Sequence, residues 1–188
     1  MRIVTGSARG TNLQTLEGEE ITRPTPAAVK EAVFGSIQFD IEGRNILDIF
    51  AGCGQMGLEA LSRGAAKATF VDANRDAINV ITENAKKTHL YQKSNVLCMD
   101  WAQYIKSAAG RNVFDIVFID PPYASELVPS VAASLYDSKL VNENSILICE
   151  SGHALDKELP EIKERYEVKK ENRYGRVFVT YLIPKTEK

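Results

Sequence analysis

The segment Asp120-Pro121-Pro122-Tyr123 combines a carboxylate, a rigid backbone and an aromatic ring directly after an apolar run. The two prolines fix φ and remove two backbone donors, while their carbonyl oxygens can still accept hydrogen bonds. A carboxylate beside a carbonyl can bind both hydrogens of a planar amine, and Tyr123 offers a ring on which an extruded base can stack. We predict that these four residues catalyse methylation of an exocyclic base amine; the alternative is a rigid turn with a packing tyrosine.

A second segment, Gly52 to Gly57, has the spacing G-x-G-x-x-G between an apolar run and a helical stretch. Glycines at these places allow a tight turn and a close approach of the backbone to a ligand. The same spacing serves dinucleotides and S-adenosylmethionine, and a plain strand–helix turn also fits it. The loop predicts a cofactor site but leaves the cofactor open.

Three aspartates favour S-adenosylmethionine over a dinucleotide. Asp48 lies four residues before the loop, where its carboxylate can meet a cationic amino group, which a dinucleotide lacks. Asp72 ends the next apolar run, at the distance expected for a ribose contact, and Asp100 ends the third, where it can accept from an adenine amine. Ligands of open α/β sheets bind at the carboxyl edge of the strands, where all three would lie.

The elements that must position these groups follow from hydrophobic patterning. Apolar runs at 45–50, 68–72, 95–100, 114–120 and 145–150 predict strands covered on both faces. Between them, Ala77, Ile78, Ile81 and Ala85 share one helical face, with Asn, Glu and Lys opposite, and Leu127, Val128, Val131 and Leu135 share another. This alternation predicts an α/β fold, a Rossmann-like, mostly parallel sheet with helices on both faces.

The two ends of the chain have a different pattern. Residues 1–40 predict a hairpin around glycines and then a helix, begun by Thr25-Pro26, with Val29, Ala32, Val33 and Ile37 on its apolar face. Residues 166–183 predict a second hairpin. We therefore expect an N-terminal extension over 1–40 and a main domain over 41–188.

Composition limits the classes of function. The 188 residues carry 23 basic and 25 acidic side chains, a net charge of −2, and 44% are hydrophobic, as in an ordinary globular domain. No apolar run could span a bilayer and the first residues are too polar for a signal peptide, so a cytoplasmic location is expected. Three cysteines and two histidines, far apart, indicate neither a disulfide framework nor a metal site.

Together these segments resemble the RsmD-type enzymes, class I S-adenosylmethionine-dependent methyltransferases. The resemblance covers nearly the whole chain and rests on residues 6–10, 23–25, 48–54, 57–64 and 120–123. It implies seven strands with the last antiparallel, and methylation of the N2 amine of a guanine in 16S ribosomal RNA. Departures are Cys53, where the family often has Ser, Gln55-Met56 in place of Ala-Leu, and Asp72 in place of Glu.

The expected cofactor contacts come from the strand ends, the loop and the extension: Asp48, Phe50, Gly52, Gly54, Gly57, Asp72, Ala73, Asp100, Trp101 and Thr25. In the family the segment with Thr25 approaches the methionine end of the cofactor, so Arg23 and Thr25 are open to either cofactor or RNA. Phosphate contacts are expected from basic residues of the two ends: Arg2, Arg9, Arg23, Arg173 and Arg176, with Lys30, Lys169 and Lys170 beside them. The expected partner is 16S ribosomal RNA or an assembling small subunit, bound by a monomer without metal or membrane.

Three other functions stay open. A DNA adenine-N6 methyltransferase can also carry Asp-Pro-Pro-Tyr, but it usually needs a domain that reads bases in the major groove, and too few residues flank the core. An NAD(P)-dependent oxidoreductase would need a substrate domain and a proton-transfer residue, and neither is apparent. A non-catalytic RNA-binding assembly factor could keep the fold, although Asp120 and the glycine loop are intact.

Overall fold

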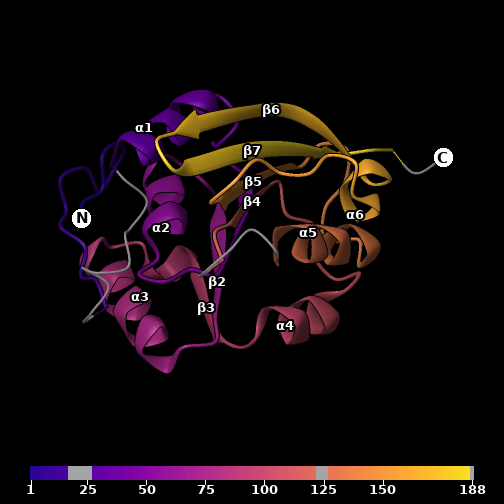
Figure 1. The fold of residues 1–188 in the computed structure, drawn as a ribbon. Coiled ribbons are helices and arrows are strands. Elements are labelled where there is room, and N and C mark those ends of the chain that lie inside the picture. The colour runs from indigo at the N-terminus through magenta and orange to yellow at the C-terminus, as the bar shows by residue number, and fades with distance from the viewer. Residues whose placement is uncertain (17–26, 122–126, 187–188) are drawn as a thin grey trace. The chain divides into compact units, whose positions relative to one another are not determined.

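The computed structural model describes residues 1–16, 27–121 and 127–186. The strands in these ranges are β1 (Asn45–Ile49), β2 (Lys67–Asp72), β3 (Ser94–Cys98), β4 (Ile116–Ile119), β5 (Ile146–Ser151), β6 (Tyr166–Tyr174) and β7 (Val177–Pro184). They form a seven-stranded sheet in the order β3-β2-β1-β4-β5-β7-β6 (Figure 1). Strand pairs β1/β2, β2/β3 and β4/β5 are parallel, whereas β7 is antiparallel to both β5 and β6. The predicted fold class is confirmed.

The described helices are α1 (Ala27–Ser36), α2 (Gln55–Ser62), α3 (Arg75–Lys87), α4 (Trp101–Ala108), α5 (Leu127–Asp137) and α6 (Pro160–Lys163), with a 3₁₀ turn at Tyr91–Lys93. The patterns expected for α2, α3 and α5 are confirmed, but no helix was predicted where α4 lies. Its buried face consists of only Tyr104, Ile105 and Ala108, which is too short a pattern to give a clear period. Among the residues that the structure describes, none of the helices could span a bilayer.

The chain divides into two compact units, residues 1–99 and 100–188, so the boundary expected at residue 40 lies inside the first unit. In that unit β1, β2 and β3 align so that Ile49 pairs with Val71, and Asp72 with Cys98. The three strands therefore end at one edge, as a parallel sheet requires. Phe70 in the middle of β2 is fully buried, and α2 and α3 both pack against this strand.

The N-terminal hairpin, residues 1–14, belongs to the same unit but is not a regular pair of strands. Arg2 and Asn12 form a single antiparallel bridge. The N–H of Ile3 donates to the carbonyl of Thr11 at 3.0 Å, and the N–H of Gly10 donates to that of Ile3 at 2.9 Å. The expected pair of strands is thus reduced to one bridge. Thr25-Pro26, the expected helix start, lies outside the described residues, and α1 is described from Ala27.

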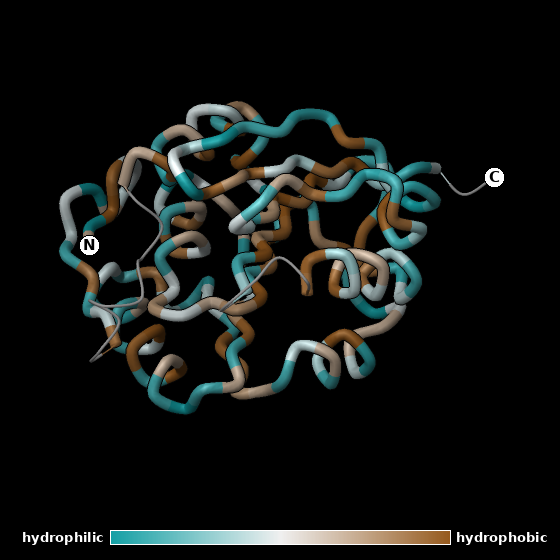
Figure 2. The backbone as a smooth tube through the Cα atoms, in the orientation of Figure 1, coloured by the Kyte–Doolittle hydropathy of each residue, from teal (hydrophilic) through white to brown (hydrophobic). Residues whose placement is uncertain are grey.

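The second unit contains β4, β5 and the C-terminal hairpin formed by β6 and β7. β7 pairs with β5 over five residue pairs and with β6 over eight, so its backbone is bonded on both sides. Among the described strands β6 pairs only with β7, and its mostly hydrophilic residues colour it teal along most of its length in Figure 2. Tyr166 at the start of β6 donates its hydroxyl to the carbonyl of Ala132 in α5 at 2.7 Å.

Candidate cofactor and catalytic site

The loop after β1 turns sharply through residues with positive φ. Phe50 has φ 83°, a left-handed conformation that is strained for a residue with a side chain, and Gly52 and Gly54 have φ 54° and 78°. The N–H groups of Phe50 and Ala51 both donate to the carbonyl of Val71, at 3.0 and 3.1 Å. The end of β2 therefore fixes the turn, and Phe50 is left half-exposed at its start.

Gly57, the third glycine of the loop, lies where α2 crosses β2. A Cβ atom at this position would lie 2.3 Å from Cε1 of Phe70, so only glycine allows this close packing of helix on strand. The N–H of Gly57 donates to Oδ2 of Asp48 at 2.9 Å, and Asp48 is only 5% exposed. The Asp48 carboxylate therefore joins β1 to the first turn of α2. Its negative charge lies near the positive N-terminal end of the helix dipole, which is a stabilising interaction.

Asp72 at the end of β2 contacts the loop directly. Its Oδ2 accepts from the N–H of Gly52 at 2.9 Å, and its Oδ1 accepts from the N–H of Asn74 at 2.8 Å. Each carboxylate oxygen has two lone pairs, so each can accept one further donor. Asp72 is half-exposed and Ala73 is exposed, which leaves this edge accessible to a ligand.

Asp100 begins the second unit as the N-cap of α4. Its Oδ1 accepts from the N–H of Ala102 at 2.9 Å and from that of Gln103 at 3.4 Å. Trp101 is the first residue of the helix and is half-exposed. An N-cap aspartate is a common way to satisfy the first N–H groups of a helix, and it is a role that the adenine hypothesis did not foresee.

The described part of the Asp-Pro-Pro-Tyr segment is Asp120 and Pro121. Asp120 directly follows β4 and is exposed, while Pro121 is buried. Pro122 and Tyr123 lie outside the described residues, as do Arg23 and Thr25. The four residues of β4 are all buried, so Asp120 is the first accessible side chain beyond that strand.

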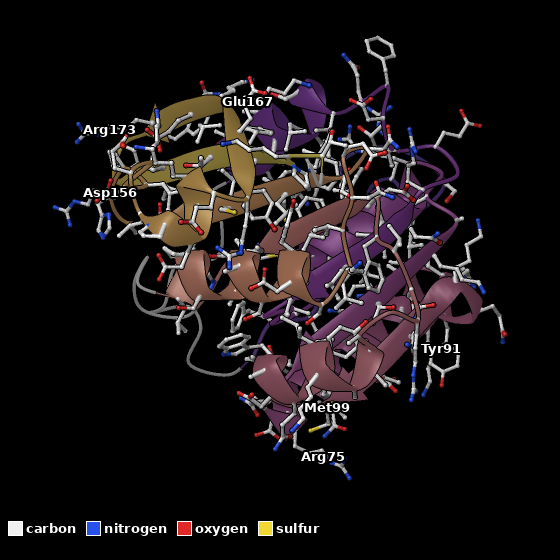
Figure 3. All side chains as sticks on the ribbon, turned by 90° about the vertical axis from the view of Figure 1, so that its right-hand side faces the viewer. Arg75, Tyr91, Met99, Asp156, Glu167 and Arg173 are labelled. Atoms are coloured by element: carbon white, nitrogen blue, oxygen red, sulfur yellow. The ribbon has the colours of Figure 1, made fainter. Side chains whose placement is uncertain are left out.

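The basic residues expected to contact RNA have different environments. Arg2, Arg9 and Arg176 are exposed. Arg173 is also exposed; its Nε donates to the carbonyl of Gly175 at 2.8 Å and its guanidinium lies 5.4 Å from the ring centre of Phe178. Figure 3 shows this side chain at the periphery, directed away from the strands. These four arginines remain available to a polyanion.

Lys30 does not fit that expectation, because its ammonium is buried and bonded within the protein. Its side chain is 3% exposed; its Nζ donates to the carbonyl of Arg2 at 2.7 Å and lies 3.2 Å from Oε2 of Glu59. Buried lysines need such a partner because an isolated ammonium is costly to remove from water. Lys30 therefore joins α1 to the N-terminal hairpin and to α2.

Glu59 and Ser62 of α2 are two structural residues that sequence reasoning missed. Glu59 is fully buried and accepts from the N–H groups of Val4 and Thr5, at 2.8 and 3.0 Å, in addition to its ion pairs with Lys30 and Arg63. Ser62 Oγ donates to the carbonyl of Thr5 at 2.6 Å and accepts from the N–H of Ala8 at 2.9 Å. A glutamate between Leu58 and Ala60, in an otherwise apolar stretch, was the available signal.

Asn84 of α3 is the third missed residue. It is 0% exposed and lies beside the buried residues Ile81 and Ala85. Its side-chain amide forms hydrogen bonds with both backbone groups of Gln14 and with the carbonyl of Cys53 in the glycine loop. Its position on the apolar face, three residues after Ile81, was the signal for burial.

Comparison with known proteins gives consistent matches. The family described as conserved hypothetical protein 95 matches residues 1–183. YlbH of Bacillus subtilis (strain 168) is 33% identical over 176 residues, which cover 93% of this chain and 94% of that protein. Ribosomal RNA small subunit methyltransferase D of Haemophilus influenzae is 31% identical over 152 residues, covering 80% and 78%. The solved structure of yhhF from Escherichia coli has a TM-score of 0.86 and 28% identity, covering 100% of this chain and 99% of that one.

Proposed function

The chain belongs to the conserved hypothetical protein 95 family, the RsmD family, and from that premise we propose that it methylates ribosomal RNA of the small subunit. The proposed donor is S-adenosylmethionine and the proposed acceptor is the exocyclic N2 amine of a guanine. A relative that is 31% identical bears the name of a small-subunit ribosomal RNA methyltransferase, which supports the substrate class. The proposed acceptor amine rests on the Asp-Pro-Pro-Tyr segment and on the family resemblance.

The observation that carries the cofactor proposal is the bond between Asp72 and the glycine loop. The Gly52 N–H holds one carboxylate oxygen of Asp72 at 2.9 Å, so the acid and the loop form one surface at the end of β2. The free lone pairs of this carboxylate suit the two hydroxyl groups of a ribose, which can each donate one hydrogen bond. A nucleoside cofactor therefore fits the residues present.

The remaining cofactor assignments are proposals from the sequence. Asp48 supports the loop through Gly57, and its charge would favour the ammonium group of the cofactor. The half-exposed ring of Phe50 offers apolar surface beside the loop. The other proposed contacts are those of the sequence prediction: Gly54, Ala73, Asp100, Trp101 and Thr25.

S-adenosylmethionine, when bound, supplies a methyl group on a positively charged sulfur. The protein's task is to prepare the nucleophile, since an exocyclic purine amine is poorly basic. Asp120 and the carbonyl of Pro121 would orient the amine by accepting its two hydrogens and would stabilise the positive charge that develops on nitrogen. Asp120 need not be a strong base, because the proton becomes acidic only as the new bond forms. Tyr123 would stack on the base.

The proposed RNA contacts lie on the two hairpins. Arg2 and Arg9 belong to the N-terminal hairpin, and Arg173 and Arg176 surround the turn of the C-terminal one. Exposed arginines of this kind bind phosphates without reading sequence. In this proposal the fold of the RNA selects the target nucleotide, and Asp120 binds the amine of its base.

Single-turnover methylation of small-subunit particles, with cofactor affinity measured separately, tests this function. Asp120→Asn keeps the size of the side chain but removes its charge, so the rate should fall about 10²–10³-fold with cofactor affinity unchanged. Asp72→Ala should instead act mainly on cofactor affinity, which should weaken by about 1.5–3 kcal/mol per charge-assisted bond lost. A near-normal rate for Asp120→Asn would refute the catalytic role, and tighter binding of NAD than of S-adenosylmethionine would refute the cofactor.

A further inference from the structure

Asn84 is placed to connect two parts of the first unit that sequence reasoning treated separately. Its Oδ1 accepts from the N–H of Gln14 at 2.8 Å, and its Nδ2 donates to the carbonyl of Gln14 at 3.0 Å. The same Nδ2 donates to the carbonyl of Cys53 at 2.9 Å. Gln14 ends the N-terminal hairpin, and Cys53 lies between the first two glycines of the proposed cofactor loop. One planar amide therefore bonds to both.

These bonds use both donor hydrogens of the Asn84 amide. A primary amide has two N–H donors, and one is directed at each carbonyl. Asn84 is 0% exposed, so water cannot replace a bond that is lost. A movement of the hairpin that rotates the amide would break its bond to Cys53, and a movement of the loop would break its bonds to Gln14. The two segments therefore have a common preferred geometry.

The surroundings of the loop strengthen this connection. Cys53 is flanked by Gly52 and Gly54, both at positive φ, so its carbonyl lies within the tight turn of the loop. The side chain of Ile81, one turn before Asn84, lies 3.3 Å from where a Cβ of Gly54 would be. The Sγ of Cys53 also lies 3.5 Å from the Sδ of Met1 in the hairpin. Helix α3 and the hairpin thus both contact the loop at Cys53 or Gly54.

We propose that Asn84 is a positioning residue that couples the N-terminal hairpin to the loop Gly52–Gly57, so that RNA and cofactor strengthen each other's binding. This inference rests on the proposed function, in which Arg2 and Arg9 contact RNA and the loop holds the cofactor. RNA held on the hairpin would fix Gln14, and through Asn84 it would fix the Cys53 carbonyl in the geometry that the cofactor requires. Because binding linkage is reciprocal, the cofactor would improve RNA affinity by the same factor.

The test measures this factor with S-adenosylhomocysteine, which cannot donate a methyl group. Filter binding measures the affinity of the protein for small-subunit particles purified from cells that lack the enzyme. The affinity is measured once without S-adenosylhomocysteine and once at a saturating concentration of it. For the wild-type chain we expect at least about five-fold tighter particle binding with the probe, at the lower end of ordinary coupling. Asn84→Ala should bring this ratio close to one. Asn79→Ala, an exposed asparagine on the same helix, is the matched control and should keep the wild-type ratio.

Two further variants separate coupling from folding. Asn84→Leu has a similar volume and buries no charge, so it fills the space of the amide without bonding to Cys53 or Gln14; it should lose the ratio even if Asn84→Ala does not fold. Ser62→Ala removes hairpin bonds at Thr5 and Ala8 but leaves the bonds of Asn84 in place, so it should keep a ratio well above one. A ratio of one in the wild type, or a wild-type ratio in a folded Asn84 variant, would overturn the inference. Failure of the free wild-type chain to bind the probe would instead refute the proposed function, and the inference with it.

Discussion

The two hairpins at the ends of the chain, residues 1–14 and 166–184, carry the same kind of exposed arginine but are held by different interactions. The C-terminal hairpin is held by backbone bonding, because β7 pairs with β5 on one side and with β6 on the other. The N-terminal hairpin has one bridge and a few backbone hydrogen bonds between its arms, and buried side chains of α2 and α3, namely Glu59, Ser62 and Asn84, bond to much of the rest of its backbone.

This difference predicts how each hairpin responds to substitution. A backbone ladder does not depend on the identity of a particular side chain, so most exposed positions of β6 should tolerate change. A hairpin held by a few buried polar side chains loses several bonds when one of them is removed, and the groups left behind are buried without partners. Single substitutions should therefore affect the N-terminal hairpin more strongly.

The largest expected contrast is between Glu59→Ala and Glu171→Ala. Removing Glu59 leaves the Lys30 ammonium buried without its carboxylate, together with two backbone N–H groups, and should cost on the order of 3–5 kcal/mol of unfolding free energy. Glu171 of β6 accepts from Leu155 N–H and Thr180 Oγ, but its side chain is 17% exposed, so water can replace it and the cost should be about 1–2 kcal/mol. Urea unfolding measures both.

The double variant Glu59→Ala with Lys30→Met is the control for this contrast. It removes the buried ammonium as well as its partner, so it should recover part of the stability lost in Glu59→Ala. Equal losses of unfolding free energy in Glu59→Ala and Glu171→Ala would contradict the proposed difference between the two hairpins.

A smaller contrast is expected between two glycines with positive φ, Gly6 and Gly175. A Cβ on Gly6 would lie 1.8 Å from the carbonyl oxygen of Ser62, whereas a Cβ on Gly175 would meet nothing within 4 Å. Gly175→Ala should cost only the left-handed conformation, about 1–2 kcal/mol. Gly6→Ala adds a steric clash and should cost about 1–3 kcal/mol more. Thermal unfolding of the two variants ranks them, and a Gly175→Ala variant as unstable as Gly6→Ala would contradict the proposed difference.

The smallest expected effect concerns the exposed arginines that both hairpins carry. Arg9→Ala and Arg173→Ala should each make the slope of log affinity for RNA against log salt shallower by about 0.7–0.9, because each removes one phosphate contact. Cofactor affinity should not change. Arg173→Lys keeps the charge and should keep the slope, although it loses the stacking on Phe178. If only one hairpin alters the slope, the RNA footprint is confined to that end of the chain.

The interior strands were predictable because their signals are local. Each of the five apolar runs corresponds to β1–β5 to within two residues, since a continuous apolar run bounded by turn residues is typical of a strand buried on both faces. The glycine loop and Asp72 were predictable for the same reason: the spacing of loop, strand and acid fixes their meeting at one edge.

The residues that hold the N-terminal hairpin were not predictable from local patterns. Glu59 bonds to Val4 across 55 residues and Asn84 to Gln14 across 70, far beyond any helical or strand period. Polarity alone does not distinguish the buried Asn84 from the exposed Asn79 of the same helix, and a charge alone suggested a phosphate contact for Lys30. Both side chains are buried because a distant backbone segment supplies their partners, as buried polar groups require.

The outer strand β6 has a consequence for the protein's behaviour in a crowded solution. An edge strand presents unpaired backbone groups that can recruit a strand from another molecule. Here the pairing with β7 is interrupted by a register shift between Val168 and Lys170, and Glu167, Lys169 and Lys170 are exposed along the strand; Figure 3 labels Glu167 there. A bulge and closely spaced charges make this edge a poor template for self-association. The chain can thus keep a long strand open to solvent without inviting edge-to-edge aggregation.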